Sequence, residues 1–269
     1  MADNAPRLTE SRAETKRHMS SKADYLVVIP ARYESGRLPG KPLIELLGVP
    51  LVHRTWHRCT QAVPAERIYV ATDDRRIFDY CAEVGIQVAM TPDDCLTGTD
   101  RIAAFAEDHP AALYINVQGD EPVIDPEDIT RVLATARERP GEIINGMCEI
   151  TEEALFRNPS IPKLVTRPDG RLLYMSRAAI PTTKRHLFKA AWRQICIYAF
   201  PPDALAAFAA ATSKSTLEAV EDIEILRFLE MGYEVRMIPL SDSSVAVDTP
   251  DDIPRAEAAI RAQGLERLD

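Results

Sequence analysis

Short apolar runs rich in β-branched residues alternate with stretches of helical periodicity along the first half of the chain. Strands are expected at 25–29, 68–71, 87–90 and 112–117, and helices at 50–61, 75–84 and 100–108. The last of these strands is apolar except for Asn116, which is typical of a strand buried on both faces. The alternation predicts an α/β fold with a mostly parallel, doubly wound sheet, whose site lies beyond the carboxyl ends of the strands.

The second half of the chain has a less regular pattern. Apolar runs predict strands at 143–150, 163–165, 172–175, 193–199 and 234–237, and 216–232 is predicted to be one long amphipathic helix. Residues 1–22 are polar and lack periodicity, which predicts a flexible leader. No repeat or linker divides the rest, so residues 23–269 are expected to form a single domain with an elaborated, mixed second half.

Charge and cysteine content narrow the class of protein. The net charge is −9, from 32 Lys and Arg against 41 Asp and Glu, and the cations lie singly in loops, which argues against a nucleic-acid surface. No apolar run reaches membrane-spanning length and no signal peptide is recognised, so we expect no membrane insertion. The five cysteines are scattered without a Cys-x-x-Cys pair, which favours reduced thiols in the cytoplasm over a structural zinc.

The first strand ends in a loop rich in cations and glycines, which holds Arg32, Ser35, Gly36, Arg37, Gly40 and Lys41. Glycines let backbone N–H groups approach phosphate oxygens, and fixed cations neutralise charge that moves during phosphoryl or nucleotidyl transfer. The loop is not a Walker motif, because the two glycines are too close together and Pro42 follows the lysine. The loop therefore predicts a triphosphate site, with an ordinary basic loop as the structural alternative.

Two acidic turns are candidate magnesium ligands. Asp120 lies in the turn 118–122 after the buried fourth strand, where a carboxylate can hold Mg²⁺ together with waters and phosphates. A solvated turn or a helix cap is the alternative. The second turn, Thr249–Asp252, is an ordinary helix start with proline and acids in its first turn. Asp248 precedes that start and remains free to be a second ligand.

Three further segments could face a ligand. Segment 97–101 joins a loop to a helix, and its amides and Arg101 are expected to be available to an anionic or polar ligand, although such a helix start is often purely structural. Arg177 ends a strand and could clamp a carboxylate or form a surface pair. Glutamates at 218, 221 and 224 have helical spacing, which is also typical of a solvated face.

Taken together, these blocks resemble the 3-deoxy-manno-octulosonate cytidylyltransferases, the CMP-Kdo synthetases. The resemblance runs from about Tyr25 to Ile260, and the blocks that carry it are 30–43, 71–74, 98–101, 116–122, 174–181, 217–227 and 247–250. It implies a Rossmann-like fold of the nucleotide-diphospho-sugar transferase type and a homodimer. It also implies a Mg²⁺-dependent reaction in which CTP and a 3-deoxy-2-ulosonic acid give a CMP-sugar and pyrophosphate, for lipopolysaccharide or capsule synthesis.

The resemblance also implies roles for individual residues. Arg32, Lys41, Asp120 and Asp248 would be catalytic, with the two aspartates holding magnesium. Nucleotide-binding residues would be Arg32, Ser35, Arg37, Lys41, Thr72, Asp73, Gly98 and Thr99. Sugar-binding residues would be Arg101, Gln118, Arg177, Gln194, Tyr198, Glu218, Glu221 and Ile225. Among these, Arg177 would face the carboxylate of the sugar.

The chain departs from the family pattern in segments expected near the sugar. Gln194 and Cys196 replace the histidine and glycine of the family's His-x-Gly-x-Tyr run, and Ile225 replaces an amide. The loop also has Ser35-Gly36 where Ser-Thr is typical. CTP is therefore the firmer part of the prediction, and a variant such as an amino-Kdo, or another ulosonate, is a possible acceptor. Neutral drift would explain the same changes.

Two other functions are weighed against this one. Cytidylyl transfer to a nonulosonic acid of the sialic type is disfavoured, because those enzymes usually have Lys-Asn where this chain has Lys41-Pro42. A nucleotide-binding protein without turnover is disfavoured because Lys41, Asp120 and Asp248 are all retained.

Overall fold

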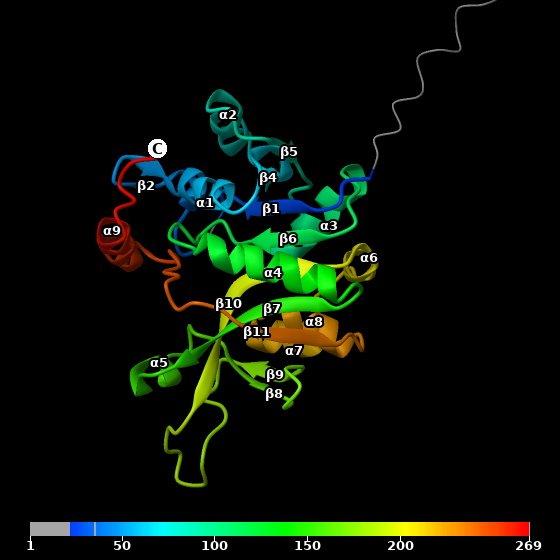
Figure 1. Ribbon diagram of the computed structural model, residues 1–269, viewed down its shortest axis with the longest axis vertical. Coiled ribbons are helices and arrows are strands. Elements are labelled where there is room, and N and C mark those ends of the chain that lie inside the picture. The colour runs from blue at the N-terminus through cyan, green and yellow to red at the C-terminus, as the bar shows by residue number, and fades with distance from the viewer. Residues whose placement is uncertain (1–21, 35, 269) are drawn as a thin grey trace, which may run out of the picture.

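The computed structural model describes residues 22–34 and 36–268 and is built on a nine-stranded sheet (Figure 1). Its strands are β1 (Leu26–Ala31), β4 (Ile68–Thr72), β5 (Val88–Met90), β6 (Tyr114–Val117), β7 (Ile143–Ile150), β8 (Lys163–Thr166), β9 (Leu172–Ser176), β10 (Ala191–Phe200) and β11 (Val235–Pro239). Each of the nine predicted strands is present. The predicted leader up to residue 21 and the candidate residue Ser35 lie outside the described residues.

The strand order is β11-β7-β10-β6-β1-β4-β5, and β8 pairs with β10 and β9. The strands β6, β1, β4 and β5 are parallel, so their carboxyl ends meet at one edge. The long strand β10 runs antiparallel to β6 and β7, while β7 and β11 are parallel. The first half is therefore the predicted parallel sheet, and the second half is the predicted mixed one. A small hairpin, β2 (Glu45–Leu46) and β3 (Val49–Pro50), lies apart from this sheet.

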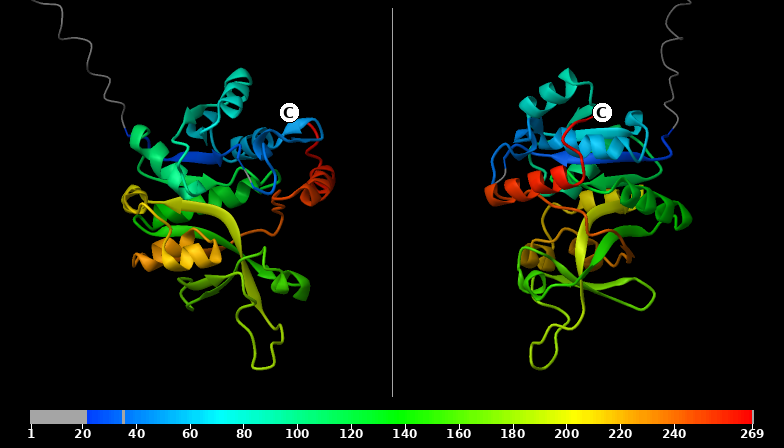
Figure 2. Two further views of the ribbon diagram at one scale, coloured as in Figure 1. Left: turned by 180° about the vertical axis from the view of Figure 1, so that it is seen from behind. Right: turned by 60° about the vertical axis from the view of Figure 1, so that its left-hand side comes forward.

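Helices cover both faces of the sheet (Figures 1 and 2). They are α1 (Leu51–Thr60), α2 (Arg75–Glu83), α3 (Gly98–Asp108), α4 (Pro126–Glu138), α5 (Glu153–Arg157), α6 (Pro202–Ala210), α7 (Thr216–Glu221), α8 (Ile225–Glu230) and α9 (Ile253–Ala262), with 3₁₀ turns η1 (Lys41–Leu43), η2 (Ala65–Arg67) and η3 (Pro250–Asp252). One core cluster joins α1, α2 and α4 to the sheet, and a second joins α3, α6 and α8 to the other face. This arrangement confirms the doubly wound α/β prediction.

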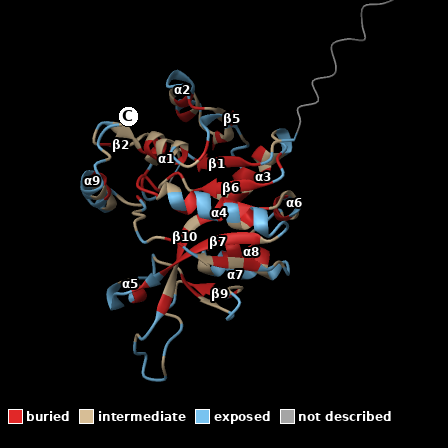
Figure 3. Cartoon of the chain, viewed as in Figure 1, coloured by how far each residue is buried: buried red, intermediate tan, exposed pale blue. Residues whose placement is uncertain are grey.

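Burial follows the layers (Figure 3). Every residue of β1 and β6 is buried, because helices cover these strands on both sides. Apolar side chains alternate between the two core clusters along β1, with Val27 and Ile29 on one face and Val28 on the other. In the part of the chain that the structure describes, no helix is long and apolar enough to cross a membrane.

The prediction of one helix across 216–232 is wrong. The helix α7 ends at Glu221, Asp222 adopts a left-handed backbone with φ 52° and ψ 51°, and α8 begins at Ile225. The break is stabilised from another segment, because Arg177 donates hydrogen bonds to the carbonyl oxygens of Glu221 (2.5 Å) and Asp222 (2.9 Å). A helix end leaves such carbonyls without intrahelical partners, and the arginine satisfies them.

Candidate active site

A cavity of about 650 Å³ opens beyond the carboxyl ends of β1 and β6, a size typical of ligand pockets. The predicted site residues that line it are Arg32, Arg37, Lys41, Gly98, Arg101, Gln118, Asp120, Arg177 and Asp248. The other lining residues are Pro30, Ala31, Gly36, Pro42, Leu96, Thr97, Gly119, Lys214, Asp222 and Glu224. The cavity therefore joins the loop after the first strand to both acidic turns and to the second half of the chain.

Gly119 lets the turn after β6 pass close to the end of β1. A Cβ atom at this position would lie 2.8 Å from the carbonyl oxygen of Pro30, which is too close for any side chain. The buried Thr55 on α1 donates its hydroxyl to the Gly119 carbonyl at 3.3 Å. Asp120 follows directly and is thereby held beside the loop that leaves β1.

A tight turn at Gly40 returns Lys41 to the same place. Gly40 has a left-handed backbone with φ 70°, and its N–H donates to the carbonyl of Tyr33 at 2.8 Å. Glycine adopts this conformation without the steric penalty of a Cβ atom. The turn η1 begins at Lys41. The Lys41 side chain lines the cavity together with Ala31, the last residue of β1.

The Lys41 ammonium joins the two predicted carboxylates. Its Nζ atom lies 2.7 Å from Asp120 Oδ2 and 3.2 Å from Asp248 Oδ1, and Arg37 Nη2 lies 3.1 Å from the same Asp248 oxygen. Burial disfavours the charged ammonium, but attraction to Asp120 and Asp248 outweighs it and raises the pKa of Lys41. A fixed positive charge therefore lies between the two carboxylates.

Asp248 is free to face the cavity because the turn after it is capped by its own residues. Thr249 and Asp252 form a capping box around η3, and the Asp252 carboxylate also accepts the Asp248 N–H at 3.1 Å. The N–H of Val247 donates to the Asp120 carbonyl at 3.0 Å. Two acidic turns that are far apart in the sequence are thus tied together through their backbones.

The chemistry of Asp120 and Asp248 fits a hard divalent cation. Both present carboxylate oxygens to one cationic centre, and Mg²⁺ prefers oxygen ligands, binding through one or two carboxylates plus waters and substrate phosphates. Within residues 22–34 and 36–268, no group of three His, Cys, Asp or Glu side chains is placed to hold a metal ion. The protein would therefore supply two carboxylates and leave the remaining positions to water and phosphate oxygens.

Arg177 lies on the wall of the cavity directly after β9. Besides the two carbonyls at the end of α7, its guanidinium donates to the Pro159 carbonyl at 3.2 Å. Its own N–H donates to the Glu221 carboxylate at 2.9 Å, and the buried Lys163 donates to its carbonyl at 2.5 Å. An arginine has five N–H donors, so three bonds to carbonyls fix the guanidinium and leave donors for a ligand.

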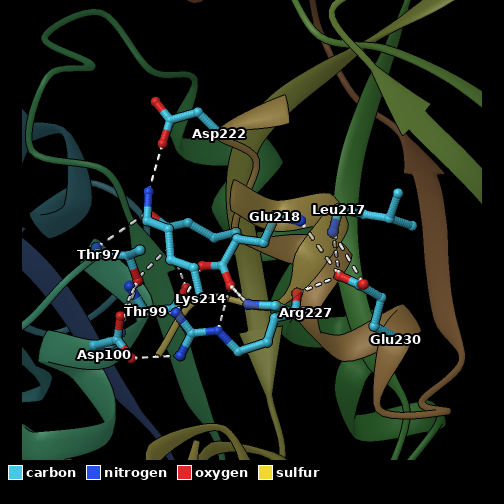
Figure 4. Close-up of polar contacts among 12 residues, drawn as sticks. Thr97, Thr99, Asp100, Lys214, Leu217, Glu218, Asp222, Arg227 and Glu230 are labelled. Atoms are coloured by element: carbon cyan, nitrogen blue, oxygen red, sulfur yellow. Dashed lines mark hydrogen bonds and ion pairs between the residues drawn. The ribbon is translucent and has the colours of Figure 1, made fainter. Parts of the chain in front are cut away.

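Behind this wall, a buried arginine ties α8 to α7 and α3 (Figure 4). Arg227 donates to both carboxylate oxygens of Glu218 (2.6 and 2.7 Å) and to Asp100 (2.7 and 3.3 Å). Its guanidinium also stacks on Phe208, 3.7 Å from the ring centroid. Arg227 and Glu218 are 1% and 0% exposed, so the pair is a structural connection between helices.

The N–H groups at the start of α3 are bound by a side chain of the protein itself, which agrees with the structural alternative for this segment. The Glu224 carboxylate accepts the N–H groups of Gly98 (3.1 Å) and Thr99 (2.9 Å), and the Thr99 hydroxyl at 2.5 Å. Arg101 is buried and donates to Asp73 at 2.6 Å. A helix N-terminus attracts a carboxylate, and here the protein supplies its own. The predicted roles of these residues in binding stay predictions.

The remaining described candidates are not among the residues that line the cavity, and they are Thr72, Asp73, Thr99, Gln194, Tyr198, Glu218, Glu221 and Ile225. Gln194 is buried and donates to Asn145 (2.9 Å) and to the Tyr198 hydroxyl (3.1 Å). Ile225 is 1% exposed and packs in the core under α8. Glu221 accepts from the Ser176 hydroxyl at 2.6 Å as well as from Arg177. The predicted nucleotide contacts of Thr72, Asp73 and Thr99 stay predictions, as do the predicted sugar contacts of the other five residues.

Three charged lining residues have no predicted role from the sequence: Lys214, Asp222 and Glu224. Glu224 was seen only as part of a helical row of glutamates, and the break at Asp222 turns it toward α3. Lys214 donates to the Asp222 carboxylate at 2.7 Å, and no local motif marks it. Tertiary contacts bring these three residues to the cavity, and their spacing in the sequence does not mark them.

Comparison with known proteins identifies the family of this chain. Residues 26–237 match the cytidylyltransferase family model. The 3-deoxy-manno-octulosonate cytidylyltransferase of Syntrophotalea carbinolica is 40% identical over 247 residues, covering 87% of this chain and 97% of the relative. That of Porphyromonas gingivalis is 36% identical over 258 residues, covering 90% and 99%.

Solved structures give the same result. The structure of CMP:2-keto-3-deoxy-manno-octonic acid synthetase complexed with CTP has a TM-score of 0.82 and 33% identity, covering 91% of this chain and all of that one. A putative glucose-1-phosphate thymidylyltransferase from Bacillus anthracis, at 14% identity and a TM-score of 0.64, shares the fold. The chain belongs to the 3-deoxy-manno-octulosonate cytidylyltransferase family.

Proposed function

We propose that this protein transfers CMP from CTP to the anomeric 2-hydroxyl of 3-deoxy-manno-octulosonate or a close variant such as an amino-Kdo, giving a CMP-sugar and pyrophosphate for lipopolysaccharide or capsule synthesis. The observation that carries the proposal is the Lys41 ammonium between Asp120 and Asp248, in one cavity with Arg177. The group of Lys41, Asp120 and Asp248 suits a triphosphate, and Arg177 suits the carboxylate of an acidic sugar. The named relatives and the CTP complex support this choice of substrates.

The reaction forms one bond to phosphorus and breaks another. The 2-hydroxyl oxygen attacks the α-phosphorus of CTP, the bond to the β-phosphate oxygen breaks, pyrophosphate leaves, and the hydroxyl proton passes to solvent. Both reactants are anions, so their approach requires fixed positive charge. Arg32, Arg37 and Lys41 supply this charge beside the triphosphate, and Arg177 holds the sugar carboxylate.

Asp120 and Asp248 would hold the predicted Mg²⁺. When bound, the ion would offset charge on the triphosphate and on the leaving pyrophosphate. Lys41 would keep the two carboxylates together before metal and nucleotide arrive, because it bonds to both. A homodimer and a cytoplasmic location stay predictions, which light scattering and cell fractionation would check.

Pyrophosphate release tests the function and separates it from its alternatives. The protein is incubated with Mg²⁺, CTP and one of a panel of 2-keto-3-deoxy acids that includes Kdo, 8-amino-Kdo and a sialic acid. We expect release with Kdo or its amino variant. Release with the sialic acid alone would favour the nonulosonate reaction. No release with any acid, despite measurable CTP binding, would favour a nucleotide-binding protein without turnover.

A further inference from the structure

Lys214 and Asp222 form an ion pair on the cavity wall, next to Arg177. The Lys214 Nζ atom lies 2.7 Å from Asp222 Oδ1, and Arg177 Nη2 lies 3.9 Å from Asp222 Oδ2. The Lys214, Asp222 and Arg177 side chains are 30%, 72% and 35% exposed. One carboxylate is therefore flanked by two cations, and all three groups are within reach of a ligand in the cavity.

The backbone explains why these groups meet. Lys214 lies in the segment between α6 and α7, and Asp222 ends α7 in a left-handed conformation. An aspartate tolerates this conformation better than most residues. The Asp222 carbonyl accepts a hydrogen bond from Arg177, so the residue is fixed at the wall. Figure 4 shows the Lys214 side chain reaching Asp222.

The electrostatics of this part of the wall favour an anion. The hydrogen bond from Lys214 and the charges of Lys214, Arg177 and Arg32 lower the pKa of Asp222. Three cations from separate segments thus act on a single exposed carboxylate. The nearby Glu224 already accepts three hydrogen bonds from the start of α3. Lys214 and Arg177 therefore share a single exposed carboxylate, that of Asp222.

We propose that Lys214 is an acceptor-binding residue, whose ammonium is held ready by Asp222 and binds the carboxylate of the acidic sugar together with Arg177. An ammonium has three N–H donors, and one is used on Asp222. The triphosphate already has Arg32, Arg37 and Lys41 in the loop after β1. Lys214 instead shares Asp222 with Arg177, which places it with the acceptor. This inference rests on the proposed function.

Two substitutions at the ion pair have opposite expected effects. Lys214→Met removes the cation, and we expect the KM for Kdo to rise about tenfold, the effect of losing a charged hydrogen bond, with kcat and the KM for CTP within about twofold of wild type. Asp222→Asn releases the Lys214 ammonium and removes a negative charge that repels the sugar carboxylate, so the KM for Kdo falls about two- to threefold.

Two further variants are controls. Lys214→Arg keeps the positive charge, and we expect its KM for Kdo to stay near that of wild type. Lys189→Met, on the exposed loop before β10, is the matched control.

Three results would overturn the proposal. One is a Lys214→Met variant with an unchanged KM for Kdo, and another is an effect that falls on CTP instead. The third is an Asp222→Asn variant that raises the KM for Kdo as much as Lys214→Met does, because the pair would then only shape the wall. Thermal unfolding of each variant checks that it is folded.

Calorimetric titration with Kdo separates failure of this inference from failure of the proposed function. If the wild type turns over and the Lys214→Met variant has the wild-type KM for Kdo, only the role of Lys214 is rejected. Wild type that binds Kdo without releasing pyrophosphate rejects the catalytic function, and the Kd ratio of Lys214→Met to wild type still decides the role of the lysine. Wild type that binds neither Kdo nor its amino variant rejects both.

Discussion

The two ends of the cavity are built in different ways. The proposed nucleotide end consists of the loop 30–43 with Asp120 and Asp248, and its charged groups lie in the loops that follow β1 and β6 or in the turn that precedes η3. The acceptor end consists of Arg177, Lys214, Asp222 and Glu224, which are held by contacts between distant segments. The first end depends on short local turns, whereas the second depends on a network of helices.

We therefore expect substitutions at the two ends to have different effects. At the nucleotide end, a change acts directly on the groups that meet the triphosphate, so we expect activity to fall while the fold survives. At the acceptor end, the wall rests on the buried pair of Arg227 and Glu218, so changes behind it act on stability first. The following predictions test that contrast.

The largest effect is expected from the carboxylates of the nucleotide end. Asp120→Ala or Asp248→Ala removes a predicted metal ligand and abolishes CMP transfer while leaving a folded protein. Pyrophosphate release and circular dichroism measure the two properties. Asp251→Ala changes an exposed acid of the neighbouring turn and serves as the control. Turnover at the wild-type rate by either variant would reject the metal assignment.

The next effect is expected behind the acceptor end. Arg227→Met leaves Glu218 charged and buried without its partner, so the free energy of unfolding falls by about 3–5 kcal/mol. Urea denaturation measures it, with the exposed Arg255→Met as control. The double variant Arg227→Met with Glu218→Leu recovers part of the loss, because it also removes the buried charge. A single variant as stable as wild type contradicts the account.

Two glycines give a smaller, paired test. A Cβ atom at Gly119 would meet the Pro30 backbone at 2.8 Å, so Gly119→Ala shifts the Asp120 turn, costs about 1–3 kcal/mol and lowers kcat. A Cβ atom at Gly98 would lie 3.1 Å from the Gln118 side chain, which can move, and 3.4 Å from the Pro30 side chain, which is an ordinary contact distance. Gly98→Ala therefore keeps kcat closer to wild type. The reverse order of the two kcat values would contradict the proposed geometry.

The smallest effect is a pH dependence of stability at the acceptor end. The hydrogen bond from Lys214 lowers the pKa of Asp222 below its ordinary value of 3.8. The contribution of the Lys214–Asp222 ion pair to the free energy of unfolding is therefore complete above pH 3.8, and it is lost as the pH falls through the lowered pKa of Asp222. For such an exposed pair it amounts to about 0.2–1 kcal/mol. Unfolding of wild type and Asp222→Asn should differ above pH 5 and converge in acid; a constant difference would argue against the ion pair.

The same contrast explains what could be predicted from the sequence. Each of the nine strands was found from local apolar runs, and the cations and carboxylates of the nucleotide end follow directly from those strands. The helices α4 and α6 were not predicted. The start of α4 does carry local signals, an aspartate cap at Asp125 followed by proline and acidic residues, whereas α6 is mostly alanine with little amphipathic contrast. These elements are stabilised by packing on the sheet.

The acceptor end could not be predicted in the same way. The break between α7 and α8 is stabilised by Arg177, which follows the distant strand β9. The sequence of 216–232 has a continuous helical pattern and gives no local sign of the break. The contact of Glu224, at the start of α8, with the α3 amides was not predicted either. Gln194 and Ile225, which were expected in the sugar pocket, are buried and are not among the residues that line the cavity, so their predicted role stays a prediction. Side chains that come from distant segments carry no local spacing signal.

The most direct test of the central claim follows phosphorus through the reaction. Phosphorus-31 NMR is recorded on the protein with Mg²⁺, CTP and Kdo or 8-amino-Kdo. The account predicts that the triphosphate signals are replaced by one phosphodiester signal of the CMP-sugar and by pyrophosphate in equal amount. Unchanged CTP with both sugars, or hydrolysis to free CMP without a phosphodiester signal, would contradict it.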